Sequence, residues 1–207
     1  LGHLHRWLIL DRYRPLAEVP EGIEHLFSRT REPFSLCPTD PRSLELLTDL
    51  YDQLLPNFSS KLFNVGLDES FELCLGRSAE ACRQRGKGRI YLDYLLAVQR
   101  LVSARARRLQ FWADMILEHR ELIGQVPRDC VPLVWGYEAD HPFEEQLAPF
   151  AAAGLEVHVC PGTSSWKSFG GRLSNALGNL ANAARAGHQV AAKGFLVTDW
   201  GDEGHHQ

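Results

Sequence analysis

The sequence has no long hydrophobic run and no strong excess of either charge. Among its 207 residues, 22 are lysine or arginine and 26 are aspartate or glutamate, so the formal net charge is -4. A membrane-spanning helix needs about 20 consecutive apolar residues, and nucleic-acid-binding surfaces usually appear as a basic excess. We therefore expect neither a membrane span nor a nucleic-acid partner. No secretory signal peptide is visible, and a cytoplasmic location is favoured.

Cysteine is scarce, and none of the cysteines forms a CxxC pair. The odd number and the wide spacing predict neither a disulfide framework nor a zinc site. We expect most of the cysteines to be buried free thiols, and no metal or other cofactor is predicted. The five cysteines are Cys37, Cys74, Cys82, Cys130 and Cys160.

Basic residues gather near the end of one predicted helix, at Arg100, Arg105, Arg107 and Arg108. A nucleic-acid patch is one interpretation of this group. Because the whole chain is acidic, we favour a solvated helix end, where cations also suit the helix dipole.

Five short apolar runs are present, and each is followed by aromatic, acidic or glycine residues. Helical stretches separate the runs, and this β-α alternation predicts a parallel sheet with crossover helices. In such folds the ligand site lies at the carboxyl ends of the strands. The runs, with the residues that follow them, cover 62–70, 109–114, 131–138, 155–163 and 194–202.

Helix boundaries follow from capping residues and apolar periodicity. Asp40 and Pro41 predict one helix start, Ser174 is the predicted cap of the last helix, and Gly187 is its predicted end. The charged, glycine-rich stretch 77–89 is predicted to be the most mobile loop. The predicted helices cover 41–55, 90–106, 116–125, 142–153 and 174–187.

Asp68 and Glu69 are adjacent carboxylates at the end of the first apolar run. Charges are rarely buried without a partner, so the two face a cleft or solvent. One carboxyl group can protonate the leaving oxygen of an acetal while the other stabilises developing positive charge. The alternative is a strand end that runs into a polar loop, and the two residues alone favour that alternative.

Four tryptophans lie at or just after predicted strand ends: Trp112, Trp135, Trp166 and Trp200. Large aromatic residues often fill a core, and a single tryptophan would favour that interpretation. Four at equivalent positions favour a pocket, because ligand pockets are largely aromatic. A tryptophan face can stack on the C–H face of a sugar.

Several segments, in order, resemble glycoside hydrolase family 20, the β-N-acetylhexosaminidases, and especially its hexosaminidase D-like branch. The segment LGHL at 1–4 resembles the loop after the third strand of the family barrel. The resemblance covers nearly the whole chain, and the ordered set is more specific than the acidic pair alone. The other similar segments are NVGLDES at 64–70, GRS at 76–78, CPGTSSW at 160–166, NALGNL at 175–180 and TDWGD at 198–202.

The resemblance implies an α/β fold, since the family fold is a (β/α)8 TIM barrel. The five predicted strands match the fourth to eighth strands of that barrel, so we expect a partial (β/α)8 barrel. Residues 1–207 would form a single catalytic domain that is truncated at its N-terminal side and lacks the final helix. Because an open parallel sheet exposes edge strands and apolar faces, we expect the isolated fragment to be unstable, oligomeric or inactive, even if the intact protein is an active enzyme. The arginine that ends the family's first strand has no counterpart here.

The resemblance also implies residue roles. Glu69 would be the general acid and base, and Asp68 would hold the acetamido group of the substrate, whose own oxygen attacks the anomeric carbon. The implied partner is a glycan or glycoside that contains N-acetylhexosamine, and an oligomer is left open. The implied substrate-binding residues are His3, Trp112, Trp135, Tyr137, Trp166, Asp199, Trp200 and Asp202.

Two other interpretations stay open. His3, His5, Asp199, His205 and His206 resemble the ligands of metal-dependent barrel hydrolases, although the HxH segment is predicted to be partly helical. A non-catalytic carbohydrate-binding protein is the second, and the retained acidic pair argues against it.

Overall fold

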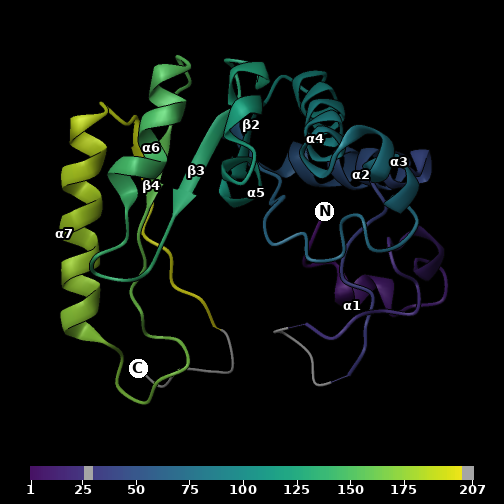
Figure 1. Ribbon diagram of the computed structural model, residues 1–207, viewed down its shortest axis with the longest axis horizontal. Helices are drawn as coiled ribbons and strands as arrows, with labels where there is room; N and C mark the ends of the chain where they lie inside the picture. The colour runs from purple at the N-terminus through teal and green to yellow at the C-terminus, as the bar shows by residue number, and fades with distance from the viewer. Residues whose placement is uncertain (26–29, 202–207) are drawn as a thin grey trace.

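The computed structural model describes residues 1–25 and 30–201. Five parallel strands form one sheet, and their order in space equals their order in the sequence. Figure 1 shows the sheet curled, with helices on its outer side. The α/β partial (β/α)8 barrel is thus confirmed. The strands are β1 (Leu62–Asn64), β2 (Arg108–Trp112), β3 (Val131–Trp135), β4 (His158–Cys160) and β5 (Gly194–Phe195).

Helices connect the successive strands, as the alternating pattern predicts. Among the described residues, no helix is long and apolar enough to span a bilayer. The α-helices are α1 (His5–Leu8), α2 (Pro41–Leu54), α3 (Ala79–Arg85), α4 (Lys87–Ser103), α5 (Asp114–Leu117), α6 (Phe143–Ala152) and α7 (Leu173–Gln189), and the 3-10 helices are η1 (Arg14–Leu16), η2 (Leu55–Asn57) and η3 (Arg120–Gln125).

The start of α2 follows from its capping residue. The Asp40 side chain accepts a hydrogen bond from the Arg42 backbone N–H at 3.0 Å, and Pro41 occupies the first turn. Asp40 also pairs with the guanidinium of Arg77 at 2.5 Å. Bonds from Arg42 and Arg77 hold the pKa of the Asp40 carboxyl well below its usual range. The predicted helix start is therefore confirmed.

Alternation along the strands separates two apolar layers. Leu109 and Phe111 of β2 belong to the main core, which also contains the buried face of α4. Trp112 and Leu133 belong to a smaller cluster, against which Leu62, Trp135 and Trp200 pack. Successive strand residues point to opposite sides of a sheet, so the second cluster lies on the face turned away from α4. That face carries the predicted aromatic residues.

Two predicted helix boundaries are wrong. Ser174 lies inside α7, whose N-cap is Arg172, and Gly187 also lies within the helix. A Cβ atom on Gly187 would lie 3.0 Å from Cγ1 of Val159. The glycine therefore permits close approach of α7 to β4. The predicted helix 116–125 is divided between α5 and η3.

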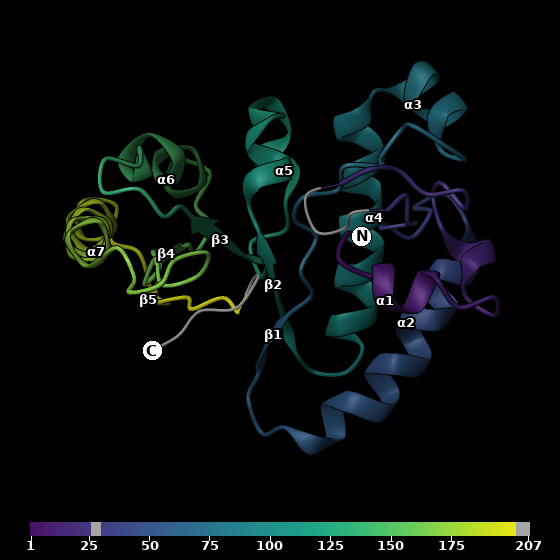
Figure 2. The same ribbon diagram turned by 90° about the horizontal axis from the view of Figure 1, so that it is seen from below.

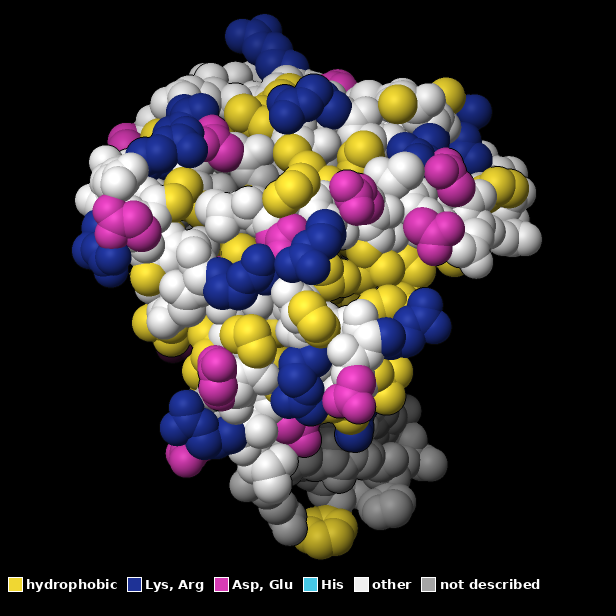
Figure 3. Space-filling view, turned by 90° about the vertical axis from the view of Figure 1, so that its right-hand side faces the viewer, with side chains coloured by type: hydrophobic (Ala, Val, Ile, Leu, Met, Phe, Trp, Pro, Cys, Tyr) yellow, Lys and Arg dark blue, Asp and Glu magenta, His cyan; other side chains and the backbone are white. Residues whose placement is uncertain are grey.

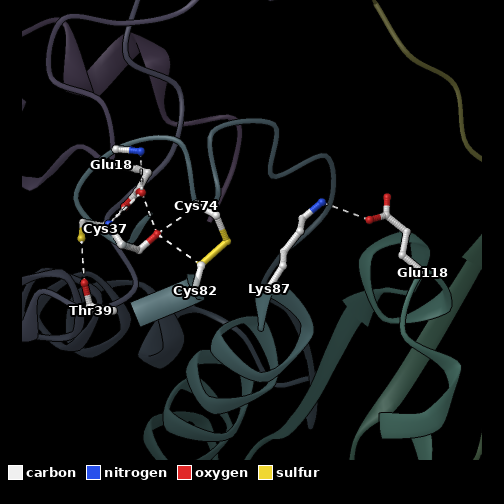
Figure 4. The surroundings of a disulfide bond; sticks show 9 residues. Glu18, Cys37, Thr39, Cys74, Cys82, Lys87 and Glu118 are labelled. Atoms are coloured by element: carbon white, nitrogen blue, oxygen red, sulfur yellow. Dashed lines mark hydrogen bonds and ion pairs between the residues drawn. A yellow bond between two sulfur atoms is a disulfide. The ribbon is translucent and has the colours of Figure 1, made fainter. Parts of the chain in front are cut away.

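The predicted mobile loop 77–89 and the expectation of no disulfide need correction. Residues Ala79–Arg85 form α3, and Cys82 on this helix forms a disulfide with Cys74 (Figure 4). A sequence separation of 8 residues brings the two cysteines together only when the chain between them turns back into the helix. Cys37, Cys130 and Cys160 are buried free thiols, as predicted.

The arginines near the end of α4 make local contacts. Arg105 pairs with Asp52 at 2.8 Å, and Arg108 pairs with Glu156 at 2.9 Å. Arg107 donates to the backbone oxygen of Phe58 at 2.9 Å. On the face drawn in Figure 3, basic side chains are interspersed with acidic and apolar ones. These contacts agree with the interpretation as a solvated helix end.

Candidate functional site

A histidine lies between the two adjacent carboxylates at the carboxyl end of β1. His3 Nε2 is 3.2 Å from Asp68 Oδ2 and 3.2 Å from Glu69 Oε2. The two acidic side chains are 19% and 25% exposed, so both remain open to a ligand. The structure therefore joins three of the predicted site residues through one imidazole.

Local backbone geometry creates this contact. His3, Leu67 and Glu69 have φ values of 62°, 72° and 42°, in the left-handed region that non-glycine residues seldom adopt. At Gly2, a Cβ atom would lie 2.8 Å from the Asp68 carbonyl oxygen. Only glycine lets the N-terminal segment pass this close to the acidic loop.

A buried glutamate links the two segments that carry these residues. Glu72 accepts hydrogen bonds from the backbone N–H groups of Phe34 and Ser35, at 3.0 and 2.7 Å. The Leu4 N–H donates to the Phe34 carbonyl oxygen at 3.0 Å. Burial raises the pKa of Glu72 to about 7. Through residues 34–35, the loop after β1 holds the segment that carries His3.

The electrostatics of His3 favour its charged form. Burial lowers the pKa of His3, but its bonds to Asp68 and Glu69 and their negative charges outweigh burial and raise the pKa to about 9. The imidazole is therefore protonated at neutral pH. One positive charge lies between two carboxylates, which offsets the repulsion between them.

Asp114 is a third carboxylate at this site, and it is absent from the set of predicted site residues. Asp114 Oδ2 accepts the backbone N–H of Glu69 at 2.9 Å, and Oδ1 accepts the Trp135 Nε1–H at 3.4 Å. Burial, together with the charge of Asp68, raises the pKa of Asp114 to about 6, although its hydrogen bonds oppose the rise. Its position at the end of the second apolar run is the sequence feature that could have identified it.

The predicted aromatic residues form one continuous wall. Trp112 and Trp200 meet edge to face, with ring centroids 6.1 Å apart. The Trp135 ring stacks on Tyr137 at 5.2 Å, and Tyr137 meets Trp166 edge to face at 4.8 Å. Trp200 Nε1 donates to the Tyr137 hydroxyl at 2.9 Å. All five rings thus belong to one set of contacts, which reaches the acidic loop through Trp135 and Asp114.

Asp199 connects two loops beside this wall. Its Oδ1 accepts hydrogen bonds from the hydroxyls of Thr163 and Ser165, the first at 2.8 Å. The Thr163 N–H also donates to the carbonyl oxygen of Thr198 at 3.0 Å. The carboxylate therefore orders the loop that carries Trp166. Asp202 lies outside the described residues.

The structure does not bring together the ligands that the metal interpretation predicts. Among the described residues, one group has metal-ligand proximity: His3, Asp68 and Glu69, whose ligand atoms lie within 4.8 Å of one another. His5 is not in this group and its ring stacks on Phe34 at a centroid distance of 5.7 Å. Asp199 is also outside it, and His205 and His206 lie beyond the described residues. The raised proton affinity of His3 favours an ion pair.

A cavity of about 310 Å³ adjoins Asp114 and Trp135. Leu117, Glu118 and Arg120 form part of its lining, with Gln146 of α6. The cavity leaves space on one side of the Asp114 carboxylate.

The model of "Glycosyl hydrolase family 20, catalytic domain" matches residues 5–174 of this chain. The chain belongs to glycosyl hydrolase family 20. Hexosaminidase D of Bos taurus is 30% identical over 129 residues, and the match covers 58% of this chain and 37% of that relative. The chain therefore spans well under half the length of this family 20 relative.

Two solved structures share the fold at low sequence identity. The β-N-acetylhexosaminidase from Bacteroides fragilis has a TM-score of 0.69 and 15% identity, and covers 98% of this chain and 42% of its own. For the chitobiase of Flavobacterium johnsoniae the TM-score is 0.67 at 13% identity, covering 96% of this chain and 30% of its own. These similarities confirm the predicted barrel fold in this family 20 chain.

Proposed function

We propose that this chain carries the acid-base pair of a β-N-acetylhexosaminidase-like glycoside hydrolase, which removes terminal N-acetylhexosamine residues. The observation that carries the proposal is the contact of His3 with both Asp68 and Glu69, beside an aromatic wall, in a family 20 domain. The names of the relatives, hexosaminidase D and β-N-acetylhexosaminidase, support the same substrate class. The partner is a glycan or glycoside that contains this sugar.

The proposed mechanism retains the anomeric configuration and uses the substrate as its own nucleophile. The 2-acetamido oxygen attacks the anomeric carbon as the glycosidic bond breaks, which forms a cyclic oxazolinium ion. Glu69 gives its proton to the leaving oxygen. Water then opens the ring, and Glu69 takes a proton from that water. A tethered nucleophile has a large effective molarity, so the protein needs to supply no attacking carboxylate.

Asp68 accepts the acetamido N–H in this proposal and stabilises the positive charge of the oxazolinium ion. His3 Nε2 lies 3.2 Å from Glu69 Oε2, so the imidazolium donates to the ionised form of this carboxylate. The proton that Glu69 gives to the leaving oxygen is replaced by the one that it takes from water. The imidazolium also keeps the two carboxylates side by side in the absence of substrate.

The aromatic rings form the wall of the proposed sugar pocket. Trp112, Trp135 and Trp200 enclose the acetamido side, while Trp166 and Tyr137 extend the wall toward Asp199. Asp199 and Asp202 remain the proposed ligands of sugar hydroxyls. Stacking on aromatic faces and a few polar contacts are sufficient to orient a sugar.

Two aryl β-glycosides that differ only at C2 test the proposal. The intact protein should hydrolyse the 2-acetamido substrate with retention and leave the 2-hydroxy substrate unchanged, because the second lacks the attacking oxygen. A 2-fluoro sugar should trap no covalent intermediate. Binding of the acetamido sugar without turnover would support the non-catalytic carbohydrate-binding alternative. A trapped peptide that carries Asp199 or Asp202 would place the nucleophile on the protein instead.

A further inference from the structure

We propose that Asp114 is a positioning residue that holds Glu69 in its working conformation and couples it to the aromatic wall through Trp135. The inference rests on the proposed function for its catalytic consequence, but its structural claim can be measured independently. Asp114 acts through the backbone of Glu69, whose N–H it accepts.

The backbone at Glu69 needs an external restraint. Its φ of 42° lies in the left-handed region, and Gly66 and Leu67 before it also have positive φ values, 73° and 72°. Such residues persist where surrounding contacts determine the conformation. The Glu69 N–H points to Asp114 Oδ2 at 2.9 Å, so a carboxylate supplies the acceptor that this N–H needs.

The restraint comes from a rigid part of the molecule. Asp114 begins α5, directly after the end of β2. The Trp112 N–H donates to the Gly66 carbonyl oxygen at 2.9 Å, and the Ala113 N–H donates to the Leu133 carbonyl oxygen at 3.0 Å. The sheet therefore fixes both the Asp114 backbone and the beginning of the acidic loop.

The two carboxylate oxygens of Asp114 accept hydrogen bonds from different residues. Oδ1 faces Trp135 Nε1 at 3.4 Å while Oδ2 faces Glu69, so one carboxylate links the acid to the wall. An ionised acceptor makes a stronger hydrogen bond than a neutral one. In the described part of the chain Asp114 forms no ion pair, so electrostatic pairing with a cation is not the reason for its position.

The charged and titratable groups around Asp114 come from four elements. Asp68 and Glu69 lie on the loop after β1, and the buried Tyr91 of α4 donates to the Leu67 carbonyl oxygen at 3.2 Å. Glu118 and Arg120 lie across the cavity. The factors that shift the pKa of His3 are burial, Asp68 and Glu69. The ionisation of His3 therefore reports where the Glu69 carboxylate lies.

Asp114→Ala and Asp114→Asn form the matched pair for the test. Alanine removes both acceptors, whereas the asparagine oxygen can still accept the Glu69 N–H. Glu118→Gln is the control, because Glu118 lines the same cavity and pairs with Lys87 at 3.0 Å, away from Glu69. The first readout is the NMR titration of the His3 imidazole in the full chain. The second is turnover of N-acetylhexosaminides with poor and with activated leaving groups.

In Asp114→Ala, we expect the His3 titration midpoint to fall by about one pH unit, because Glu69 moves away. Turnover of the poor leaving group should fall by about 10- to 100-fold, more than that of the activated substrate, since misplacement weakens proton donation. Asp114→Asn should keep most of both properties. Glu118→Gln should change neither.

An unchanged His3 titration in Asp114→Ala, or the same shift in Glu118→Gln, would overturn the inference. If Asp114→Ala does not fold, Asp114→Glu replaces it: this variant keeps the charge but moves the carboxylate into the cavity. A His3 midpoint that falls in Asp114→Glu and not in Asp114→Asn supports positioning, and the reverse contradicts it. Failure of the proposed function is separate, because wild-type protein would then hydrolyse no N-acetylhexosaminide while the titration still tests Asp114.

Discussion

Glu69 and His3 share one contact at the residue scale, yet the proposed chemistry gives them different tasks. Glu69 must transfer a proton during bond cleavage, whereas His3 stays beside both carboxylates at 3.2 Å. The two roles can be separated by experiment, since one depends on the leaving group and the other on pH.

Replacement of Glu69 by Gln should reduce turnover of substrates with poor leaving groups by about 10²- to 10⁴-fold, because general acid catalysis supplies that amount. Activated aryl glycosides need no proton on the leaving oxygen and should lose much less. Steady-state kinetics with both substrate types measures the difference. Equal losses would show that Glu69 is not the acid.

Replacement of His3 by Gln should reduce stability in a pH-dependent way. The pKa of His3 is raised to about 9 in the folded state, from about 6.5 in an unfolded chain. Its stabilising contribution is therefore complete below about pH 6.5 and is lost as pH rises through about 9.

The free energy of unfolding in urea, measured from pH 6 to 10, gives this contribution as wild type minus His3→Gln. The difference should be largest at pH 6 and shrink toward pH 10. His188→Gln, on the exposed surface of α7, controls for loss of a histidine elsewhere. A difference that grows with pH would contradict the ion pair.

The element scale brings the disulfide into view, because it ties α3 to the loop that follows the acidic pair. Cys74 lies five positions after Glu69, and Cys82 lies within α3. Ser78 reinforces the same turn: its hydroxyl donates to Glu18 and accepts from the Cys74 N–H. The loop after β1 is thus held at both ends.

The double substitution Cys74→Ser and Cys82→Ser should lower the free energy of unfolding by about 2–3 kcal/mol, the value expected for closing a short loop. Denaturant unfolding with and without reductant measures it. Reductant should destabilise the wild type by a similar amount and leave the double variant unchanged. Alkylation of both thiols in native protein without reductant would contradict the disulfide.

At the scale of the whole molecule, the curled sheet brings residues from distant parts of the chain to one end. Figure 2 shows α1, α2 and α4 on one side of the molecule and α6 and α7 on the other, with β1 and β2 between them. The wall draws on the ends of β2, β3, β4 and β5. A ligand bound at this end should therefore stabilise the whole molecule against unfolding.

A thiazoline analogue of the oxazolinium ion should change the intrinsic fluorescence, because four of the five tryptophans form the proposed wall. It should also raise the melting temperature, since a ligand at one hundred times its Kd adds about 2.7 kcal/mol to stability. Glucose, which lacks the acetamido group, is the control ligand. Asp68→Asn should bind the analogue more weakly, and unchanged affinity would remove Asp68 from the acetamido site.

The sequence by itself determined the order and approximate bounds of the strands. Apolar runs of strand length alternate with helical periodicity, and a parallel sheet has few other ways to arrange that pattern. It also indicated that Asp68 and Glu69 lie beyond a strand end, because they come at the end of the first apolar run, separated by three residues from the end of β1 at Asn64. These properties depend on neighbours in the chain, which is why local patterns predict them.

Only the tertiary structure decided which side chains meet. The contact between His3 and Glu69 spans 66 positions, and that between Asp114 and Glu69 spans 45. Pairing of Cys74 with Cys82 depends on the turn into α3. The charge and glycine content of this segment had predicted a mobile loop in place of that helix. Gly187 resembled a helix end because the sequence does not show that β4 packs against it. Long-range contacts depend on sheet curvature and loop paths, and no periodicity within one segment records them.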